Sequence, residues 1–268
     1  MPASVRARRR LIGRAGDSEG SRALPEETPI AFTYGRDTYA VMMATPSDLE
    51  DFAIGFSLTE GIVAAPSEIA ELEIVDLPNG RELRMTLAPG RDEALLARRR
   101  RIAGPAGCGL CGIESLEAAT RPPPAVASAL HIGSNEIFRA MALLRGEQTL
   151  NALTKGVHAA GFWLDGALVA VREDVGRHNA LDKLAGALAR TGRSASAGVV
   201  VLTSRVSIEL VQKTAMIGCP VIVAVSVPTA LALRTAEAAN ITLVAIARDD
   251  SFEVFTHPER IGVAAHVD

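Results

Sequence analysis

Cys108 and Cys111 are the two residues of this chain whose type and spacing are best suited to chemistry. They lie in the segment 107–112, where glycine flanks the pair on both sides and also stands between the two cysteines. Because glycine has no side-chain bulk and adopts positive φ readily, this composition predicts an exposed loop instead of packed core. Arginines at 98–101 precede the loop, and nearby cations favour the thiolate, the form of cysteine that attacks sulfur or binds metals. The segment therefore predicts sulfur or metal chemistry.

Three kinds of chemistry are compatible with this spacing. A structural zinc site usually takes four cysteine or histidine ligands, often as two close pairs, but Cys219 and the five scattered histidines supply no second pair. A thioredoxin-like redox pair normally opens a helix after a strand, whereas this pair follows an arginine-rich segment and is embedded in glycine. The third is a persulfide carrier, in which one cysteine accepts a sulfur atom and passes it on. The short motif by itself leaves all three open.

A second group of charged residues lies in the segment 173–183, at a predicted strand end and the start of the following helix. Ligands of open α/β sheets bind beyond the carboxyl ends of strands, where helix N-termini favour anions. Arg177, His178 and Lys183 could therefore meet a phosphate or a pterin. The alternative is a capped helix with a solvated charged face, on which Asp182 and Lys183 lie at the surface.

Three later strand ends have the same polar character. Ser204 and Arg205 follow one predicted strand, and the segment 226–229 follows the next. A hydroxyl and an arginine at a helix start suit an anionic group, although ordinary N-capping by serine is the alternative. The segment 247–251 ends the last predicted core strand. Several such junctions together favour a ligand site more than any one of them alone.

Two weaker candidates and one thiol stand apart from these segments. Lys155 and His158 precede a hairpin strand and could point into the same cleft. Cys219 lies between Gly218 and an apolar strand, so we expect it to be buried as a small hydrophobe.

The apolar patterns predict two units of different architecture. The first is a small α+β unit, with strands at 29–34, 37–43, 69–76 and 82–87 and a helix at 49–59. The second alternates strands and helices, with strands at 158–164, 167–172, 198–203, 220–226 and 241–247 and helices at 134–144, 174–190, 207–217 and 228–239. Asp165 and Gly166 predict that the first two of these strands form a hairpin. The apolar strands that alternate with helices after it predict a largely parallel sheet covered on both faces. The expected fold class is therefore α/β.

Composition and proline content divide the chain further. We expect a disordered basic tail at 1–27, a first domain at 28–121, a linker at 122–132 that begins with three prolines, and a second domain at 133–268. The net charge of -3 gives no argument for binding nucleic acid. No apolar run approaches the ~18 residues that a membrane span needs. Three cysteines do not make a secreted disulfide scaffold, so a cytoplasmic location is expected.

Several segments, taken in order, resemble the FdhD family of formate dehydrogenase accessory sulfurtransferases. The similarity runs over 28–261, and no single segment decides it, but their joint order is specific. The matching segments are 43–46 with 48–56, 60–62, the cysteine loop at 108–112, 173–183, 204–205, 209–213 and 256–258.

The resemblance implies a sulfur carrier, an enzyme that takes persulfide sulfur from a cysteine desulfurase. Such a carrier passes the sulfur to the bis-guanine-dinucleotide molybdenum cofactor for formate dehydrogenase, and GDP is a partial mimic of that cofactor. Cys108 matches the family's persulfide cysteine, and Cys111 matches the second cysteine of the pair. A homodimer is also implied. The cofactor-binding segment of the family matches Ile246, Ala247, Arg248, Asp249, Asp250 and Ser251.

The family resemblance also implies that the second domain has a cytidine-deaminase-like three-layer α/β/α fold. Zinc deaminases carry H-x-E on one helix and P-C-x-x-C on the next. This chain has His178 followed by Asn179 and Ala180, without the glutamate, and no paired cysteine lies in 207–219. We therefore expect the fold without zinc and without deaminase activity.

Two other functions compete with sulfur transfer. A cofactor-binding chaperone would need the cleft but not the thiols. A thiol-disulfide oxidoreductase would need both thiols but no nucleotide. The sequence does not choose between molybdenum and tungsten.

Overall fold

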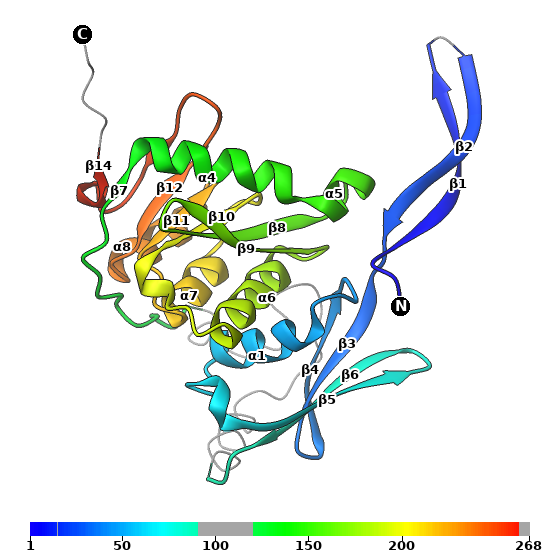
Figure 1. Cartoon of the computed structure of the whole chain (residues 1–268), viewed down its shortest axis with the longest axis horizontal. Coiled ribbons are helices and arrows are strands. Elements are labelled where there is room, and N and C mark those ends of the chain that lie inside the picture. The colour runs from blue at the N-terminus through cyan, green and yellow to red at the C-terminus, as the bar shows by residue number, and fades with distance from the viewer. Residues whose placement is uncertain (15, 91–119, 263–268) are drawn as a thin grey trace.

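Two sheets, one from each half of the chain, are joined through a pair of crossed helices in the computed structural model (Figure 1). The structure describes residues 1–14, 16–90 and 120–262. None of the helices in these ranges is both long enough and apolar enough to cross a membrane.

The N-terminal sheet has the strand order β4-β3-β6-β5, with β3 and β6 parallel and the other neighbours antiparallel. One helix, α1, packs on it, and Phe32 of β3 meets Phe52 and Phe56 of α1 with ring centroids 4.9 and 4.1 Å apart. This unit confirms the predicted α+β arrangement. Its elements are β3 (Thr28–Tyr34), β4 (Asp37–Ala44), α1 (Leu49–Thr59), a 3-10 turn (Pro66–Glu68), β5 (Ile69–Leu77) and β6 (Gly80–Leu87).

The C-terminal sheet has six strands in the order β13-β12-β11-β10-β8-β9. β10, β11 and β12 run parallel to one another, and β8 and β9 form the predicted hairpin. The prediction of a largely parallel sheet is wrong where β8 pairs antiparallel with β10, and β13 adds an antiparallel edge strand beside β12. The two-residue turn at Asp165 and Gly166 forces β8 and β9 to be antiparallel. The strands are β8 (His158–Leu164), β9 (Ala167–Asp174), β10 (Val199–Leu202), β11 (Val221–Ala224), β12 (Thr242–Ala245) and β13 (Glu253–Val254).

Helices cover both faces of this sheet, which confirms the α/β class. On one face α4 buries apolar residues such as Leu144 against Val201 and Val223. On the other face α6, α7 and α8 share a core with Phe162 and Ile222. The likeness to cytidine deaminases stays a prediction. The helices are α4 (Ser134–Glu147), α5 (Thr149–Thr154), α6 (Arg177–Arg190), α7 (Ile208–Met216) and α8 (Ala230–Ala238).

The described part of the proline-rich linker packs along the second sheet's helical layer. Val126 is buried, its N–H donates to the carbonyl of Ala239, and its own carbonyl accepts from Asn240. The chain then enters a short ribbon of β7 (Ile132–Gly133) and β14 (Ile261–Gly262). The linker is therefore fastened to the second domain along its length. Two further 3-10 turns are at Ala195–Ala197 and Pro258–Arg260.

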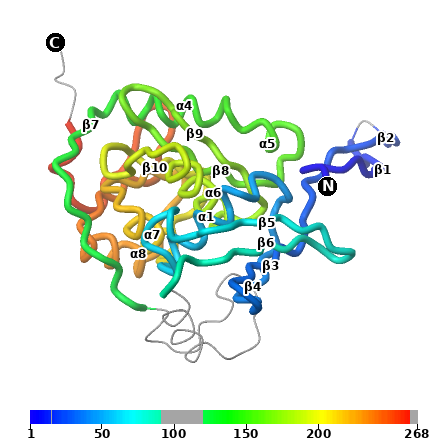
Figure 2. Tube along the Cα trace, turned by 60° about the horizontal axis from the view of Figure 1, so that its bottom comes forward, coloured from blue at the N-terminus to red at the C-terminus, as the bar shows by residue number. Residues whose placement is uncertain are grey.

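The N-terminal segment is a long hairpin, which corrects the prediction of a disordered tail. β1 (Ser4–Gly13) pairs with β2 (Gly16–Pro25) in continuous antiparallel register, and the hairpin extends away from both sheets (Figure 2). Its many arginines suggested disorder, but Val5 lies opposite Leu24 and Arg10 forms an ion pair with Asp17 at 2.8 Å across the hairpin. Such cross-strand pairs are the unit by which a β-ribbon is stabilised.

α1 and α6 cross at two glycines, which brings the domains into direct backbone contact. A Cβ atom on Gly55 would collide with the carbonyl of Asp182, and a Cβ on Gly186 with that of Asp51. Beside the crossing, the buried carboxylate of Asp51 accepts hydrogen bonds from Arg172 at 2.7 Å and Arg190 at 2.8 Å. The two domains therefore form one packed unit.

Candidate functional site

The carboxyl ends of β9, β10, β11 and β12 meet at one edge of the C-terminal sheet. Leu202 of β10 lies opposite Ala224 of β11 and opposite Ala160 of the antiparallel β8. The start of β8, His158, is paired with the end of β9, Asp174. The sequence prediction that these polar strand ends share an edge is therefore correct.

A loop of the N-terminal domain is fastened to this edge by a buried ion pair. Asp174 accepts hydrogen bonds from the N–H groups of Thr45 at 3.0 Å and Gly176 at 2.8 Å. Lys183 lies 2.6 Å from the same carboxylate and donates to the carbonyl of Thr45 at 2.9 Å. Neither side chain of the pair is exposed. Lys183 is thus a structural cation, and the prediction that it lies at the surface is wrong.

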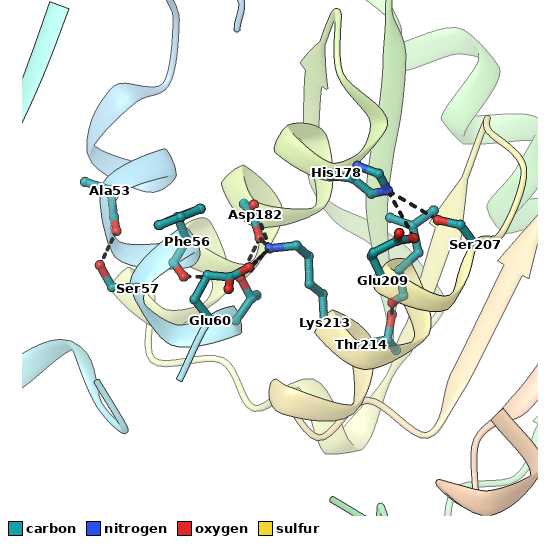
Figure 3. Close-up of polar contacts among 12 residues, drawn as sticks. Ala53, Phe56, Ser57, Glu60, His178, Asp182, Ser207, Glu209, Lys213 and Thr214 are labelled. Atoms are coloured by element: carbon teal, nitrogen blue, oxygen red, sulfur yellow. Dashed lines mark hydrogen bonds and ion pairs between the residues drawn. The ribbon is translucent and has the colours of Figure 1, made fainter. Parts of the chain in front are cut away.

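His178 is the centre of a polar cluster at the N-termini of α6 and α7 (Figure 3). Its Nε2 lies 3.2 Å from the hydroxyl of Ser207 and 3.8 Å from a carboxylate oxygen of Glu209. Burial and the neighbouring cations Arg177 and Lys213 lower the pKa of His178 to about 4, against the opposing effect of Glu209. The imidazole is therefore neutral at pH 7.

Ser207, His178 and Glu209 are the residue types of a hydrolase triad, but their order in space is different. In a triad the acid orients the ring through one nitrogen while the serine contacts the other. Here both Ser207 and Glu209 approach Nε2. The cluster is therefore not arranged for serine-type nucleophilic catalysis.

One helical turn further along α6 and α7, a second group of polar contacts connects the two helices. Lys213 lies 2.9 Å from Asp182 and 2.9 Å from Glu60, and Thr59 donates a hydrogen bond to Asp182 at 2.6 Å (Figure 3). Asp182 has no exposed surface, so the prediction that it lies at the surface is also wrong. Burial lowers the pKa of Lys213, but Asp182 and Glu60 more than compensate and raise it above its ordinary value.

Arg177 and Arg205 are the cations of this edge that remain available for an anion. Nε of Arg177 has no hydrogen-bond partner, and Arg177 lies close enough to His158 and His178 to lower the pKa of both, alongside burial. Arg205 is exposed, and within the described ranges no ion pair or hydrogen bond engages its guanidinium. Together they give the edge a positive potential that suits phosphate.

The hydroxyl groups at the strand ends are mostly satisfied locally. Ser204 is buried and donates to the carbonyl of Arg205 at 2.9 Å. Thr229 accepts a hydrogen bond from the N–H of Ala232 at 3.1 Å, which makes it the N-cap of α8. For these two residues, local hydrogen bonding explains the hydroxyl without a ligand.

The predicted cofactor segment follows β12 and lies further along the same edge. Ile246 has a positive φ of 51°, and the N–H of Arg248 donates to the carbonyl of Ser251, which closes a turn. Asp249 pairs with Arg145 of α4 at 2.5 Å, on the face of the sheet opposite α6 and α7. Since β12 lies two strands from β10, the segment is about 10 Å from the Arg205 junction. Ala247 is buried, whereas Asp250 is exposed.

Of the three cysteines, only Cys219 falls within the described ranges. It is buried as predicted, and burial raises the pKa of its thiol to about 12. Cys108 and Cys111 lie outside the described residues, as do the arginines at 98–101. A reactive thiol must therefore come from that pair.

The described ranges contain no group of three or more His, Cys, Asp or Glu side chains arranged to hold a metal ion. The expected absence of zinc stays a prediction for the chain as a whole.

Sequence reasoning missed the roles of Glu209, Lys213 and Glu60. A usable signal was present, because His178 and Asp182 are four residues apart on α6 and Glu209 and Lys213 are four apart on α7. Side chains at this spacing lie on one helix face. An aspartate on one such face and a lysine on the other favour neighbouring helices.

Fold and site together define a two-domain α/β protein with a cationic ligand edge on its larger sheet. A family model described as FdhD/NarQ matches residues 25–262, so this chain belongs to the FdhD/NarQ family. The chain is 54% identical over 267 residues to a sulfur carrier protein FdhD of Agrobacterium fabrum, covering 96% of this chain and 98% of that protein. It is 56% identical over 249 residues to the protein of the same name in Brucella abortus, covering 92% and 93% of the two chains.

A solved structure has the same fold. The crystal structure of a formate dehydrogenase accessory protein from Desulfotalea psychrophila matches with a TM-score of 0.78 and 28% identity, covering 97% of this chain and 100% of that one. The family predicted from the ordered sequence segments is thus confirmed. The N-terminal hairpin lies almost wholly outside the residues that the family model matches.

Proposed function

We propose that this protein is a sulfur carrier that accepts persulfide sulfur from a cysteine desulfurase and delivers it to a bis-guanine-dinucleotide molybdenum cofactor for formate dehydrogenase. The observation that carries the proposal is the 54–56% identity, over nearly the whole chain, to relatives named sulfur carrier proteins. The similarity to the formate dehydrogenase accessory protein of Desulfotalea psychrophila supports formate dehydrogenase as the client.

Sulfur loading is a thiol exchange at Cys108. Its thiolate attacks the terminal sulfur of the donor's persulfide, the donor's S–S bond breaks, and the donor leaves as a thiolate. The terminal sulfur is then handed on. If Cys111 attacks Cys108, hydrosulfide is released and a disulfide remains. If the cofactor takes the sulfur directly, Cys108 returns as a thiolate.

The cysteine pair is close enough in sequence to reach the ligand edge. The described chain resumes at Thr120, and the carbonyl of Arg121 accepts a hydrogen bond from Gln212 of α7 at 3.0 Å. Thr120 is nine positions after Cys111, and an extended chain over that interval spans about 30 Å. Since Gln212 is one turn from Glu209 on α7, this reach includes the His178 cluster.

The cofactor would bind across the edge, with Arg177 and Arg205 as its cationic contacts and its phosphates near Arg205. Charge-assisted hydrogen bonds from arginine are the strongest that a phosphate receives from side chains. The separation of about 10 Å between the Arg205 junction and the segment 246–251 suits a long dinucleotide ligand and not a single phosphate. A homodimer, in which the loop of one subunit serves the other, is part of this proposal.

Cysteine variants test the sulfur-transfer half of the proposal. The protein is incubated with a cysteine desulfurase and cysteine, and intact-mass analysis counts added sulfur. We expect one extra sulfur atom on the wild type and on the matched control Cys219→Ala, and none on Cys108→Ala. Sulfur retained on Cys108→Ala but lost from Cys111→Ala would reverse the assignment of the two cysteines.

The same proteins separate the competing functions. A cofactor chaperone would bind GDP, as calorimetry measures, without any sulfur loading. A thiol-disulfide oxidoreductase would cycle a Cys108–Cys111 disulfide and show no affinity for GDP. Loading together with GDP binding is expected only of the sulfur carrier.

A further inference from the structure

The hydrogen bonds around His178 determine which ring nitrogen carries the proton. The carboxylate of Glu209 can only accept, and its Oε2 is buried without a hydrogen-bond partner 3.8 Å from Nε2 of His178. A lone pair on Nε2 would face that negative charge, whereas an N–H group on Nε2 faces it favourably. Nε2 also lies 3.2 Å from the hydroxyl of Ser207, whose oxygen can accept a hydrogen bond from it. The ring proton therefore lies on Nε2.

This arrangement leaves Nδ1 of His178 as an unprotonated acceptor. The ring is neutral at pH 7, since burial and the neighbouring cations lower its pKa. Within the described ranges no hydrogen bond reaches Nδ1. Nδ1 is also not one of the buried polar atoms that lack a hydrogen-bond partner. Figure 3 shows the second ring nitrogen directed away from Ser207 and Glu209. A lone pair is therefore presented at the ligand edge.

An unprotonated nitrogen selects its ligand by hydrogen-bond type. Phosphate oxygens are acceptors at pH 7 and would face this lone pair unfavourably, so phosphate contacts fall to the exposed Arg205. An N–H group fits it. Because Arg177 lies close to His178, the pair offers an acceptor beside a donor. The 2-amino-4-oxopyrimidine ring, which guanine and pterins share, presents an N–H beside a carbonyl oxygen.

We propose that Nδ1 of His178, held by Ser207 and Glu209, accepts an N–H group of a 2-amino-4-oxopyrimidine ring while Arg177 faces the adjacent carbonyl oxygen. This assignment rests on the proposed function for the presence of such a ring at the edge. His178 contacts the ligand, whereas Ser207 and Glu209 are positioning residues. The chain thereby distinguishes guanine and pterin from adenine, which has a ring nitrogen acceptor where guanine has N1–H.

Nuclear magnetic resonance tests the tautomer without any ligand. In protein labelled with ¹⁵N-histidine, we expect the Nδ1 resonance of His178 to be that of an unprotonated nitrogen at pH 7 and Nε2 that of a protonated one. His178→Asn assigns the signals by their loss. Glu209→Gln and Ser207→Ala should each reduce the preference for this tautomer. A wild-type ring protonated on Nδ1 would overturn the proposal.

Two isosteric variants test the contact with the ring. Asparagine places its amide near the position of Nδ1, and glutamine places it near that of Nε2. We expect His178→Ala and His178→Gln to weaken binding of GDP or pterin-6-carboxylate about tenfold, the effect of one lost hydrogen bond, and His178→Asn to retain most of the affinity. Loss confined to one of the two probes identifies which ring, guanine or pterin, lies at His178. ADP is the control ligand and should bind weakly to all the variants.

The possible outcomes separate this proposal from the proposed function. If the wild type binds either probe and His178→Ala binds it equally well, the role of His178 is wrong while cofactor binding stands. If His178→Gln retains affinity and His178→Asn does not, the working nitrogen is Nε2, and the proposal is overturned. If the wild type loads sulfur but binds neither probe, the cofactor half of the proposed function fails, and this contact fails with it.

Discussion

The ammonium group of Lys213 lies 2.9 Å from the carboxylate of Asp182, and neither side chain is more than 9% exposed. The pair is one of two polar contacts between α6 and α7, and the other is the contact between His178 and Glu209. Glu60, the residue that follows α1, also contacts Lys213, so one lysine joins both domains. These two contacts therefore connect the ligand edge to the domain interface.

Removal of this lysine should cost the protein much of its stability. Lys213→Met leaves Asp182 and Glu60 facing each other without a cation, and breaking a buried pair in this way costs about 3–5 kcal/mol. Lys155→Met, at an exposed position, is the matched control and should change stability by less than about 0.5 kcal/mol. Urea unfolding measures both. A loss below about 1 kcal/mol for Lys213→Met would mean that the two carboxylates are already screened by solvent.

The glycine crossing of α1 and α6 makes a second prediction about stability. Gly186→Ala introduces a methyl group into the backbone of Asp51, and overpacking against a rigid main chain costs about 2 kcal/mol or more. Gly146→Ala in α4 is the control, because a Cβ there meets nothing within 4 Å. That control should raise stability by up to about 1 kcal/mol, since glycine is a poor helix residue. Equal melting temperatures for the two variants would contradict the close approach.

Arg205 should matter for nucleotide binding and not for sulfur loading. If it makes a charge-assisted hydrogen bond to phosphate, Arg205→Ala weakens GDP binding by about 1–3 kcal/mol, as calorimetry would show. Arg36→Ala removes an exposed arginine from the turn between β3 and β4 and is the matched control. Unchanged GDP affinity in Arg205→Ala would place the phosphates elsewhere on the edge.

The pKa of His178 predicts how stability depends on pH. Its folded-state pKa of about 4 lies below the ordinary value of 6.5, so between these values the unfolded chain binds more protons than the folded one. The contribution is complete above pH 6.5 and is lost as the pH falls toward 4, with a magnitude of up to about 3 kcal/mol. His158 and Glu209, whose pKa values are also lowered, act in the same direction.

Denaturant midpoints measured from pH 7 to pH 4.5 check this dependence. The wild type should lose stability across the range, and His178→Asn should show a shallower slope. His131→Asn, which changes an exposed histidine, should follow the wild type. Parallel curves for all three proteins would show that His178 does not titrate abnormally.

Lysine chemistry offers a direct test of the buried cations. The chain contains only three lysines, and two of them, Lys183 and Lys213, are buried in ion pairs. An amine acetylating reagent should therefore modify Lys155 and the N-terminus in the folded protein and reach the other two only in denaturant. Peptide mass spectrometry gives the extent at each site. Rapid acetylation of Lys183 under native conditions would mean that the Asp174 pair opens readily.

Much of the fold could be predicted from sequence because local patterns encode it. Helix α1 begins and ends where its apolar stripe and capping residues predict, at Leu49 and Thr59. The pairing of strands that lie far apart in the sequence could not be predicted in the same way. The antiparallel pairing of β8 with β10, at Ala160 and Leu202, depends on a long-range choice that neither strand's composition records.

The position of polar residues at strand ends could be predicted from residue type, whereas the burial of charged residues that depends on distant partners could not. Arg177, Arg205 and the carboxyl edge followed from polar residues at strand ends. Asp182 and Lys183 were expected at the surface because charged residues usually lie there. Their burial requires Lys213 and Asp174 as counter-charges, and the residues of each pair become neighbours only in the folded chain.

The long sequence separation of the interdomain contacts has a consequence for synthesis of the protein. Thr59 and Asp182 are 123 residues apart, and Thr59 and Lys213 are 154 apart. A ribosome adds about 5–20 residues per second, so the newly made α1 waits roughly 6–30 s before α6 and α7 exist to cover it. During that interval Asp51 and Glu60 stay solvated, and the face of α1 around Gly55 is open to other chains. The yield of active protein should therefore depend on translation speed through residues 60–213 and on chaperones that hold the first domain.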